Sequence, residues 1–499
     1  MDEYLNLILN WFEELGIKDK FDLTKLKRQL SIITFFFKAG GVGILEAITG
    51  FGKSLVAIIL IYRFNLKYSK EKIIVVVPST KLYMDWCDHV INFGLKNVEI
   101  YVINSYVNGY IKCGTKYKCV LFIIDEIHNV LSKEALLFNQ TITCTDYQML
   151  FGMTATLSDK EKDILEEMNI PIIDTVSMSE GRRFNYISDY IIYNFGIKLN
   201  QEQREFYDRV NDIHNNNYAK FLYFVDSNKN WELIRACTCA NLTKAKVGDD
   251  WKTGIKWREW YAETMGWDGT EDHKWHPKAI GKYAQQHNWA MVERKNFLYK
   301  HESKAYYAKE IINLLNVPTI TFSETIDFTD ILTNLIGSKA KSYHTKIETK
   351  VVDKIVEERR KNFKSAKLLK QRVAGELTVD QETKEYIVTY KKQTKISGKS
   401  LKAITLREFE DGTISVLNTA KSLDEGFNVE GIELAIICSS SSQRRQTIQR
   451  NGRALRFKEG KRAIIVNLYL MDTQDEAWLK KRQKGETHIR WITTLEEII

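Results

Sequence analysis

The chain has 499 residues, of which 44% are hydrophobic and 27% are charged, and its formal net charge is +9. This length predicts two or three domains, and the absence of any run of 18 apolar residues argues against a membrane-embedded protein. Seven cysteines, an odd number, argue against a disulfide framework and suit a reducing compartment. The acidic, amphipathic start lacks the features of a signal peptide, so we expect a cytoplasmic protein. The mild positive charge is compatible with a polyanionic partner.

The stretch LEAITGFGKSLVA, residues 45–57, predicts a strand, a glycine-containing turn and an apolar helix. Glycines let backbone N–H groups turn toward an anion, and the helix adds its positive N-terminal end. Lys53 would then reach the β- and γ-phosphates of a nucleotide, and Ser54 would hold Mg²⁺. The alternative is a plain strand–helix turn, because Ala47 replaces the first glycine of the full phosphate-loop pattern.

The stretch CVLFIIDEIHNV, residues 119–130, predicts a buried strand that ends in Asp125 and Glu126. Carboxylates at the C-terminal end of such a strand lie where α/β sheets place their chemistry. Asp125 would hold Mg²⁺ through water, and Glu126 would polarise the attacking water. The alternative is a strand followed by a helix with an acidic cap.

These two stretches and six others resemble, in order, the motifs of the superfamily 2 helicase-type ATPases. Gln29, in KLKRQLSII, resembles the upstream glutamine with which that family reads adenine. The departures are Ala47 in motif I and Ile127 in the DEIH box, and neither removes a catalytic group. The matching motifs are AITGFGKS (47–54, motif I), VVVPSTKLYMDW (75–86, Ia), INSY (103–106), DEIH (125–128, II), GMTATLS (152–158, III), TITFSETIDF (319–328, IV), LNTAKSLDEGFNV (417–429, V) and QRNGRALR (449–456, VI).

The resemblance implies an α/β fold with two RecA-like P-loop domains, each on a parallel sheet, and ATP with Mg²⁺ between them. We expect the first domain over residues 1–195 and a mainly helical, Trp-rich insertion over 196–306. The second domain would span 307–475, interrupted by an insertion at 346–400, and a C-terminal tail helix would span 476–499.

The resemblance also implies roles for individual residues. The two arginines of motif VI are three residues apart and could lie on one face of a helix. The catalytic residues would be Lys53, Asp125, Glu126, Gln449, Arg453 and Arg456. Nucleotide binding would involve Gln29, Thr49, Gly50, Phe51, Gly52, Lys53, Ser54, Glu425 and Gly426, and metal binding Ser54 and Asp125. His128, Thr154 and Thr156 would couple the nucleotide to the nucleic acid, which Thr80, Lys81, Ser323, Thr419 and Lys421 would contact.

Two insertions stay open to two interpretations each. Seven of the eleven tryptophans lie between Trp231 and Trp289. They form either the aromatic core of a small helical insertion or a platform on which bases stack. Residues 346–400 predict a solvated basic helix and then a short hairpin around VDQETKEYIV (379–388). That insertion is either a decorated loop or a wedge between strands.

The resulting functional prediction is an ATP-dependent DNA helicase or translocase that unwinds or remodels branched DNA in replication, recombination or repair, similar to compact phage helicases of the UvsW kind. A double-strand translocase without strand separation, an RNA helicase and a binding subunit with a vestigial ATPase are the alternatives. We expect a monomer whose partner is DNA, with RNA as the second choice and no membrane.

Overall fold

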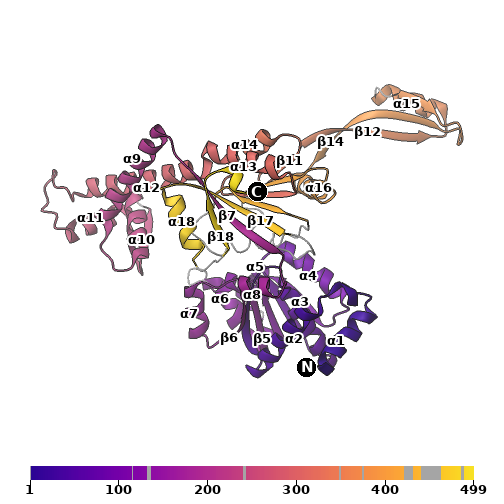
Figure 1. Ribbon diagram of the computed structural model, residues 1–499, viewed down its shortest axis with the longest axis horizontal. Helices are drawn as coiled ribbons and strands as arrows, with labels where there is room; N and C mark the ends of the chain where they lie inside the picture. The colour runs from indigo at the N-terminus through magenta and orange to yellow at the C-terminus, as the bar shows by residue number, and fades with distance from the viewer. Residues whose placement is uncertain are drawn as a thin grey trace.

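The computed structural model of the chain describes residues 2–114, 116–131, 136–239, 243–347, 350–373, 376–420, 431–439, 462–484 and 488–498. Two α/β units form its body, and two arms project from the second unit (Figure 1). One arm is helical and the other is built mainly from strands. The helices in the described ranges include none that is long and apolar enough to cross a membrane.

The first unit is a six-stranded parallel sheet in the order β3-β2-β4-β5-β1-β6. Its inner strands β2 and β4 are buried on both faces, and β2, IIVVV, consists entirely of β-branched residues. Helices therefore cover both faces. The strands are β1 (Val42–Ala47), β2 (Ile73–Val77), β3 (Val98–Val102), β4 (Tyr117–Asp125), β5 (Thr145–Thr154) and β6 (Ile172–Val176).

The helices of the first unit divide between two apolar clusters, one on each face of the sheet. One face carries α1 (Asp2–Glu14), α2 (Leu23–Lys38), α3 (Lys53–Lys67) and α4 (Thr80–Asn92). The other carries α5 (Ile103–Cys113), α6 (Leu136–Thr143) and α7 (Asp159–Glu167), and α8 (Met178–Arg183) follows β6.

The second unit is a seven-stranded parallel sheet in the order β11-β15-β10-β16-β17-β7-β18. Two parallel sheets with covering helices confirm the predicted fold class. The strands are β7 (Asp189–Ile197), β10 (Thr319–Ser323), β11 (Ala340–Tyr343), β15 (Val416–Ala420), β16 (Leu434–Ile437), β17 (Arg462–Leu470) and β18 (Ile489–Ile492). The helices are α13 (Glu302–Leu315), α14 (Ile326–Ile336), α16 (Gly398–Glu410) and α18 (Gln474–Arg482).

The sheets correct two predicted boundaries. The first domain was expected to end at residue 195, but β7 pairs along its whole length with β17 of the second sheet. The C-terminal segment was expected to be a tail helix over 476–499, but α18 ends at Arg482 and β18 then adds a strand beside β7. A buried, apolar strand shows its type in the sequence, but not the sheet that it will join.

The helical arm lies between β7 and α13. It contains α9 (Gln201–Tyr218), α10 (Ser227–Thr238), β8 (Lys244–Val247), β9 (Asp250–Thr253), α11 (Gly254–Thr264) and α12 (Pro277–Lys300). Trp257 and Tyr261 are buried in its own apolar cluster, and Trp260, Trp267 and Trp275 pack against that cluster. This arrangement agrees with the aromatic-core interpretation, although Trp251 is 62% exposed.

The second arm contains β12 (Lys350–Arg360), α15 (Phe363–Val373), β13 (Glu376–Val379) and β14 (Tyr386–Ile396). Its strands form an antiparallel sheet in the order β12-β14-β13. The predicted hairpin is present, since β13 pairs with β14 up to Val379 and Tyr386. The predicted helix is only partly correct, because residues 350–360 form a strand and the helix begins at Phe363. The β-branched residues of 350–360 pair across the ladder despite the high charge of this segment.

Candidate nucleotide site

The loop between β1 and α3 has the backbone shape that the sequence predicts for a phosphate cradle. Gly50 and Gly52 adopt positive φ angles of 90° and 87°, which residues with a Cβ rarely adopt. A Cβ on Gly52 would also lie 2.7 Å from Nε2 of Gln29. Lys53 begins α3, and its Nζ donates a hydrogen bond to the carbonyl of Ala47 at 3.0 Å. The amino group therefore lies across the loop.

Helix α2 supports this loop from behind. Gln29 is buried, and its Nε2 donates to the carbonyl of Phe51 at 2.8 Å. One helical turn earlier, Nζ of Lys25 donates to the carbonyls of Gly50 at 2.7 Å and Tyr186 at 3.1 Å, and burial lowers the pKa of Lys25 to about 8. The sequence predicted that Gln29 reads adenine, which stays a prediction, and it did not predict Lys25. The i, i+4 spacing of the two residues was the available signal.

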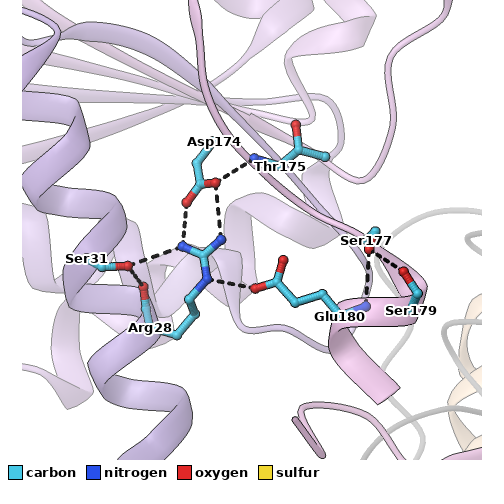
Figure 2. A network of polar contacts seen from close by, with 7 residues as sticks. All are labelled: Arg28, Ser31, Asp174, Thr175, Ser177, Ser179 and Glu180. Carbon is cyan, nitrogen blue, oxygen red and sulfur yellow. Dashed lines mark hydrogen bonds and ion pairs between the residues drawn. The ribbon is translucent and has the colours of Figure 1, made fainter. Parts of the chain in front are cut away.

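A polar cluster fixes α2 in place, as Figure 2 shows. Nε of Arg28 donates to Glu180 of α8 at 2.7 Å, and the guanidinium forms a two-pronged contact with Asp174 of β6. The hydrogen bond to Asp174 raises the pKa of Arg28. Ser177 accepts the backbone N–H of Glu180 at 3.1 Å and so caps α8. The helix that holds the phosphate loop is thus tied to β6 and α8.

Asp125 lies at the end of β4, between β2 and β5, and is 5% exposed. One carboxylate oxygen accepts Nε1–H of Trp86 at 3.0 Å, and the other accepts the backbone N–H of Glu126 at 3.0 Å. Burial and the neighbouring Glu126 raise the pKa of Asp125 to about 6. Trp86 was not predicted as a site residue, although it ends the stretch that resembles motif Ia.

Glu126 occupies the left-handed region with φ of 49°, a conformation that costs a non-glycine residue roughly 1–2 kcal/mol. Its Oε2 lies 3.3 Å from Nδ1 of His128 and accepts Oγ1–H of Thr154 at 3.3 Å. Burial alone would raise the pKa of Glu126, but the contacts with His128 and Thr154 and the charge of Lys53 outweigh it and lower the pKa to about 2. Glu126 is therefore an ionised acceptor at neutral pH.

Two of the three predicted coupling residues, His128 and Thr154, meet at this carboxylate. Nδ1 of His128 lies 2.9 Å from Oγ1 of Thr154, and that hydroxyl is also 3.3 Å from the carbonyl of Thr156. The side chains of His128 and Thr154 thus link the end of β4 to the end of β5. Thr156 takes part in this contact only through its backbone.

The predicted nucleic-acid contacts separate into two groups. Thr80 and Lys81 are exposed at the start of α4. Ser323 and Thr419 are 2% and 1% exposed, and their hydroxyls bond within the protein, to Thr329 and to the carbonyl of Thr321 among others. The structure therefore corrects these two positions, because both end buried strands of the second sheet. Six predicted residues lie outside the described ranges: Lys421, Glu425, Gly426, Gln449, Arg453 and Arg456.

The loop fits a nucleotide phosphate, and the carboxylates fit a divalent cation. Ser54 lies in the first turn of α3, and Thr49 lies in the loop, both half-buried. The ring of Phe51 is buried against Tyr186, so only the backbone of Phe51 could face a phosphate. Ser54 and Asp125 are the residues that would hold Mg²⁺, an ion that prefers oxygen ligands.

Two families match the sequence of this chain. Residues 23–116 match the type III restriction enzyme, res subunit, and residues 378–458 match the helicase conserved C-terminal domain. The chain is also 32% identical over 98 residues to DNA 3'-5' translocase XPB2 of Sulfurisphaera tokodaii. This stretch covers 20% of the chain and 21% of the relative, so the match spans about a fifth of that protein.

Two solved structures are similar over most of their length. The Pyrococcus furiosus Hef helicase domain is 15% identical with a TM-score of 0.46, over 90% of this chain and 96% of that one. S. cerevisiae Dbp5 bound to RNA and ADP BeF3 is 11% identical with a TM-score of 0.48, over 98% of this chain and 99% of that one.

Proposed function

Because the chain belongs to superfamily 2 of the helicases, we propose that it is an ATP-driven motor that unwinds or remodels DNA. The observation that carries this proposal is the convergence at one sheet edge of Lys53, Asp125 and Glu126 with the linking residues His128 and Thr154. A binding subunit with a vestigial ATPase would not need an ionised glutamate held in a strained conformation beside a phosphate cradle.

In this proposal the loop binds the β- and γ-phosphates of ATP, with Lys53 as the cationic contact. Bound Mg²⁺ would neutralise charge on these phosphates, with Ser54 and Asp125 holding it. Glu126 orients the attacking water and accepts its proton. We further propose that Arg453 and Arg456 of motif VI reach the γ-phosphate from the second unit, as the family resemblance implies. Hydrolysis would then depend on how the two units close.

The choice of DNA over RNA rests on the sequence match to a relative whose name describes a DNA translocase. We propose that branched or double-stranded DNA is the substrate and that the pathway is replication, recombination or repair. Strand separation and translocation without separation are both compatible with this motor.

On cysteine usage we place the protein in the cytoplasm, and we propose that it acts as a monomer.

The test is ATP hydrolysis without nucleic acid and with single-stranded DNA, double-stranded DNA, a four-way junction or RNA. We expect strong stimulation by double-stranded or branched DNA. Lys53→Ala should abolish hydrolysis and largely spare DNA binding. Stimulation by RNA alone would move the protein to RNA metabolism, and normal turnover by Lys53→Ala would overturn the cradle assignment.

A further inference from the structure

The strand-rich arm places a small folded tip far from the motor. Strands β12 and β14 pair over eleven residues, from Lys350 opposite Ile396 to Arg360 opposite Tyr386. At 3.2–3.4 Å per residue, the ribbon is about 35 Å long. Figure 1 shows it extending away from the second sheet, with α15 at its far end.

The tip has its own packing. Ala366 of α15 and Val388 of β14 are both fully buried, and the ring of Phe363 contacts that of Tyr386 at 5.3 Å. These contacts place the apolar side of α15 on the three-stranded sheet. The opposite side of the helix is therefore held outward as a fixed surface.

That outward surface is strongly basic. Residues 361–373 contain four lysines, one arginine and no acidic residue. The side chains of Lys361, Lys364, Lys367 and Lys370 are exposed. Because α15 rises 1.5 Å per residue, the last three lysines are spaced about 4.5 Å apart along its axis.

Two carboxylates of the arm are engaged by groups other than these lysines. Glu358 pairs with Arg360 and accepts the hydroxyl of Tyr390 at 2.7 Å. Asp380 pairs with Arg359 at 3.0 Å and accepts the backbone N–H of Glu382 at 3.0 Å. Within the described part of the arm, no ion pair neutralises the four lysines. The positive charge of these four lysines therefore faces solvent.

We propose that this tip, defined by Lys361, Lys364, Lys367 and Lys370, is a second DNA-binding site that grips the phosphate backbone beyond the motor. The inference rests on the proposed function, since it presumes that the motor works on DNA. Lysines suit this role because phosphate contacts need charge and no base readout. At 3.4 Å per base pair, the ribbon would reach about ten base pairs along a duplex. On the apolar side of α15 Ala366 is fully buried and Phe363 is half-exposed, whereas all four lysines are exposed, so a polyanion fits this surface better than the interior of a lipid layer does.

The test compares two triple variants in binding to a duplex of forty or so base pairs. Lys364→Gln, Lys367→Gln and Lys370→Gln together remove charge from the tip. The matched control is Lys38→Gln, Lys70→Gln and Lys96→Gln, three exposed lysines that precede β1, β2 and β3 at the edge opposite the phosphate loop. Both variants change the net charge equally.

We expect the tip variant to bind the duplex about tenfold more weakly at moderate salt, and its log–log salt slope to fall in magnitude by about 2–3, since each phosphate contact contributes about 0.9. The control should keep the wild-type slope. Hydrolysis of ATP without DNA should be unchanged in both, which also shows that they are folded.

A second variant replaces residues 351–395 with Asn-Gly, which can join Lys350 and Ile396 because they lie opposite each other in the ladder. It should reproduce the weaker, less salt-dependent binding. If both arm variants bind duplex like the wild type, the inference is wrong and an acidic protein becomes the partner that fits the tip. A wild-type chain that binds no DNA would instead overturn the proposed function, so the two failures are distinguishable.

Discussion

The adjacent carboxylates at the end of β4 have opposite environments. Asp125 is buried beside another acid, which favours its protonated form, whereas His128, Thr154 and Lys53 stabilise the charge of Glu126. Neighbouring groups whose pKa values are pushed apart are suited to different tasks. In the proposed mechanism Asp125 needs a metal to favour its charge, and Glu126 is charged before any ligand binds.

Glu126→Gln should slow ATP hydrolysis by about 10²–10⁴-fold, the usual contribution of a positioned general base. ATP binding should persist, because the loop and Lys53 are untouched. Single-turnover hydrolysis and equilibrium nucleotide binding measure the two effects separately. Glu99→Gln on the edge strand β3 is the control and should hydrolyse normally. Wild-type turnover by Glu126→Gln would remove Glu126 from the role of base.

The acid limb of the pH profile should report Asp125. At limiting Mg²⁺, hydrolysis should rise as the pH passes through about 6, because only the carboxylate binds the metal. Trp86→Phe removes a hydrogen bond that lowers this pKa, so the midpoint should move to higher pH. Saturating Mg²⁺ should move it lower. If neither Trp86→Phe nor saturating Mg²⁺ moves the midpoint of the acid limb, the acid limb does not report Asp125.

The same shift affects stability with a defined sign. The folded-state pKa of Asp125 lies above its ordinary value of 3.8, so the folded protein binds the extra proton between about pH 4 and 6. The contribution of Asp125 to the free energy of unfolding is therefore largest at low pH and is lost as the pH rises through about 6.

At the scale of elements, α2 holds the phosphate loop of the nucleotide site in position. Lys25 and Gln29 hold carbonyls of the phosphate loop, and Arg28 ties the helix to β6 and α8. The three residues lie within five positions of one helix, so the loop and the end of the first sheet are held by one element.

Arg28→Met should lower the thermal unfolding midpoint, because it leaves the largely buried carboxylates of Asp174 and Glu180 without their shared cation. We expect a loss of about 2 kcal/mol in the free energy of unfolding. Lys18→Met is the control: it breaks an exposed ion pair with Glu13 and should cost less than about 1 kcal/mol. Equal effects of the two substitutions would show that the Arg28 cluster does not stabilise α2.

At the scale of the whole molecule, the second sheet combines strands that are distant in the chain. Its β7 directly follows the first unit, and its edge strand β18 lies near the C-terminus. Strand β7 leaves the first unit and enters the second sheet between β17 and β18. One apolar cluster continues across this crossing, from the first sheet through Ile187 and Tyr190 to Ile320 and Ile465. The two units therefore share part of their core.

A fragment of residues 199–498 should fail to fold, because it lacks β7 and leaves the edge of β17 and the paired edge of β18 without their backbone partner. A fragment of residues 186–498 contains β7 and should be more soluble, with a cooperative unfolding transition. Size-exclusion chromatography and circular dichroism compare the two. A well-folded 199–498 fragment would mean that the second sheet does not depend on β7.

The sequence by itself determined the local features: the glycine loop before Lys53, the buried strand ending in Asp125 and Glu126, the order of the motifs and the hairpin at 379–388. These depend on short-range spacing, which residues within one element specify. Only the tertiary structure decided that β7 and β18 join the second sheet, that 350–360 is a strand, that Ser323 and Thr419 are buried, and that Lys25, Arg28 and Trp86 support the site. Each of these depends on a partner distant in the chain, and local sequence carries the type of an element but not the identity of the neighbour that completes it.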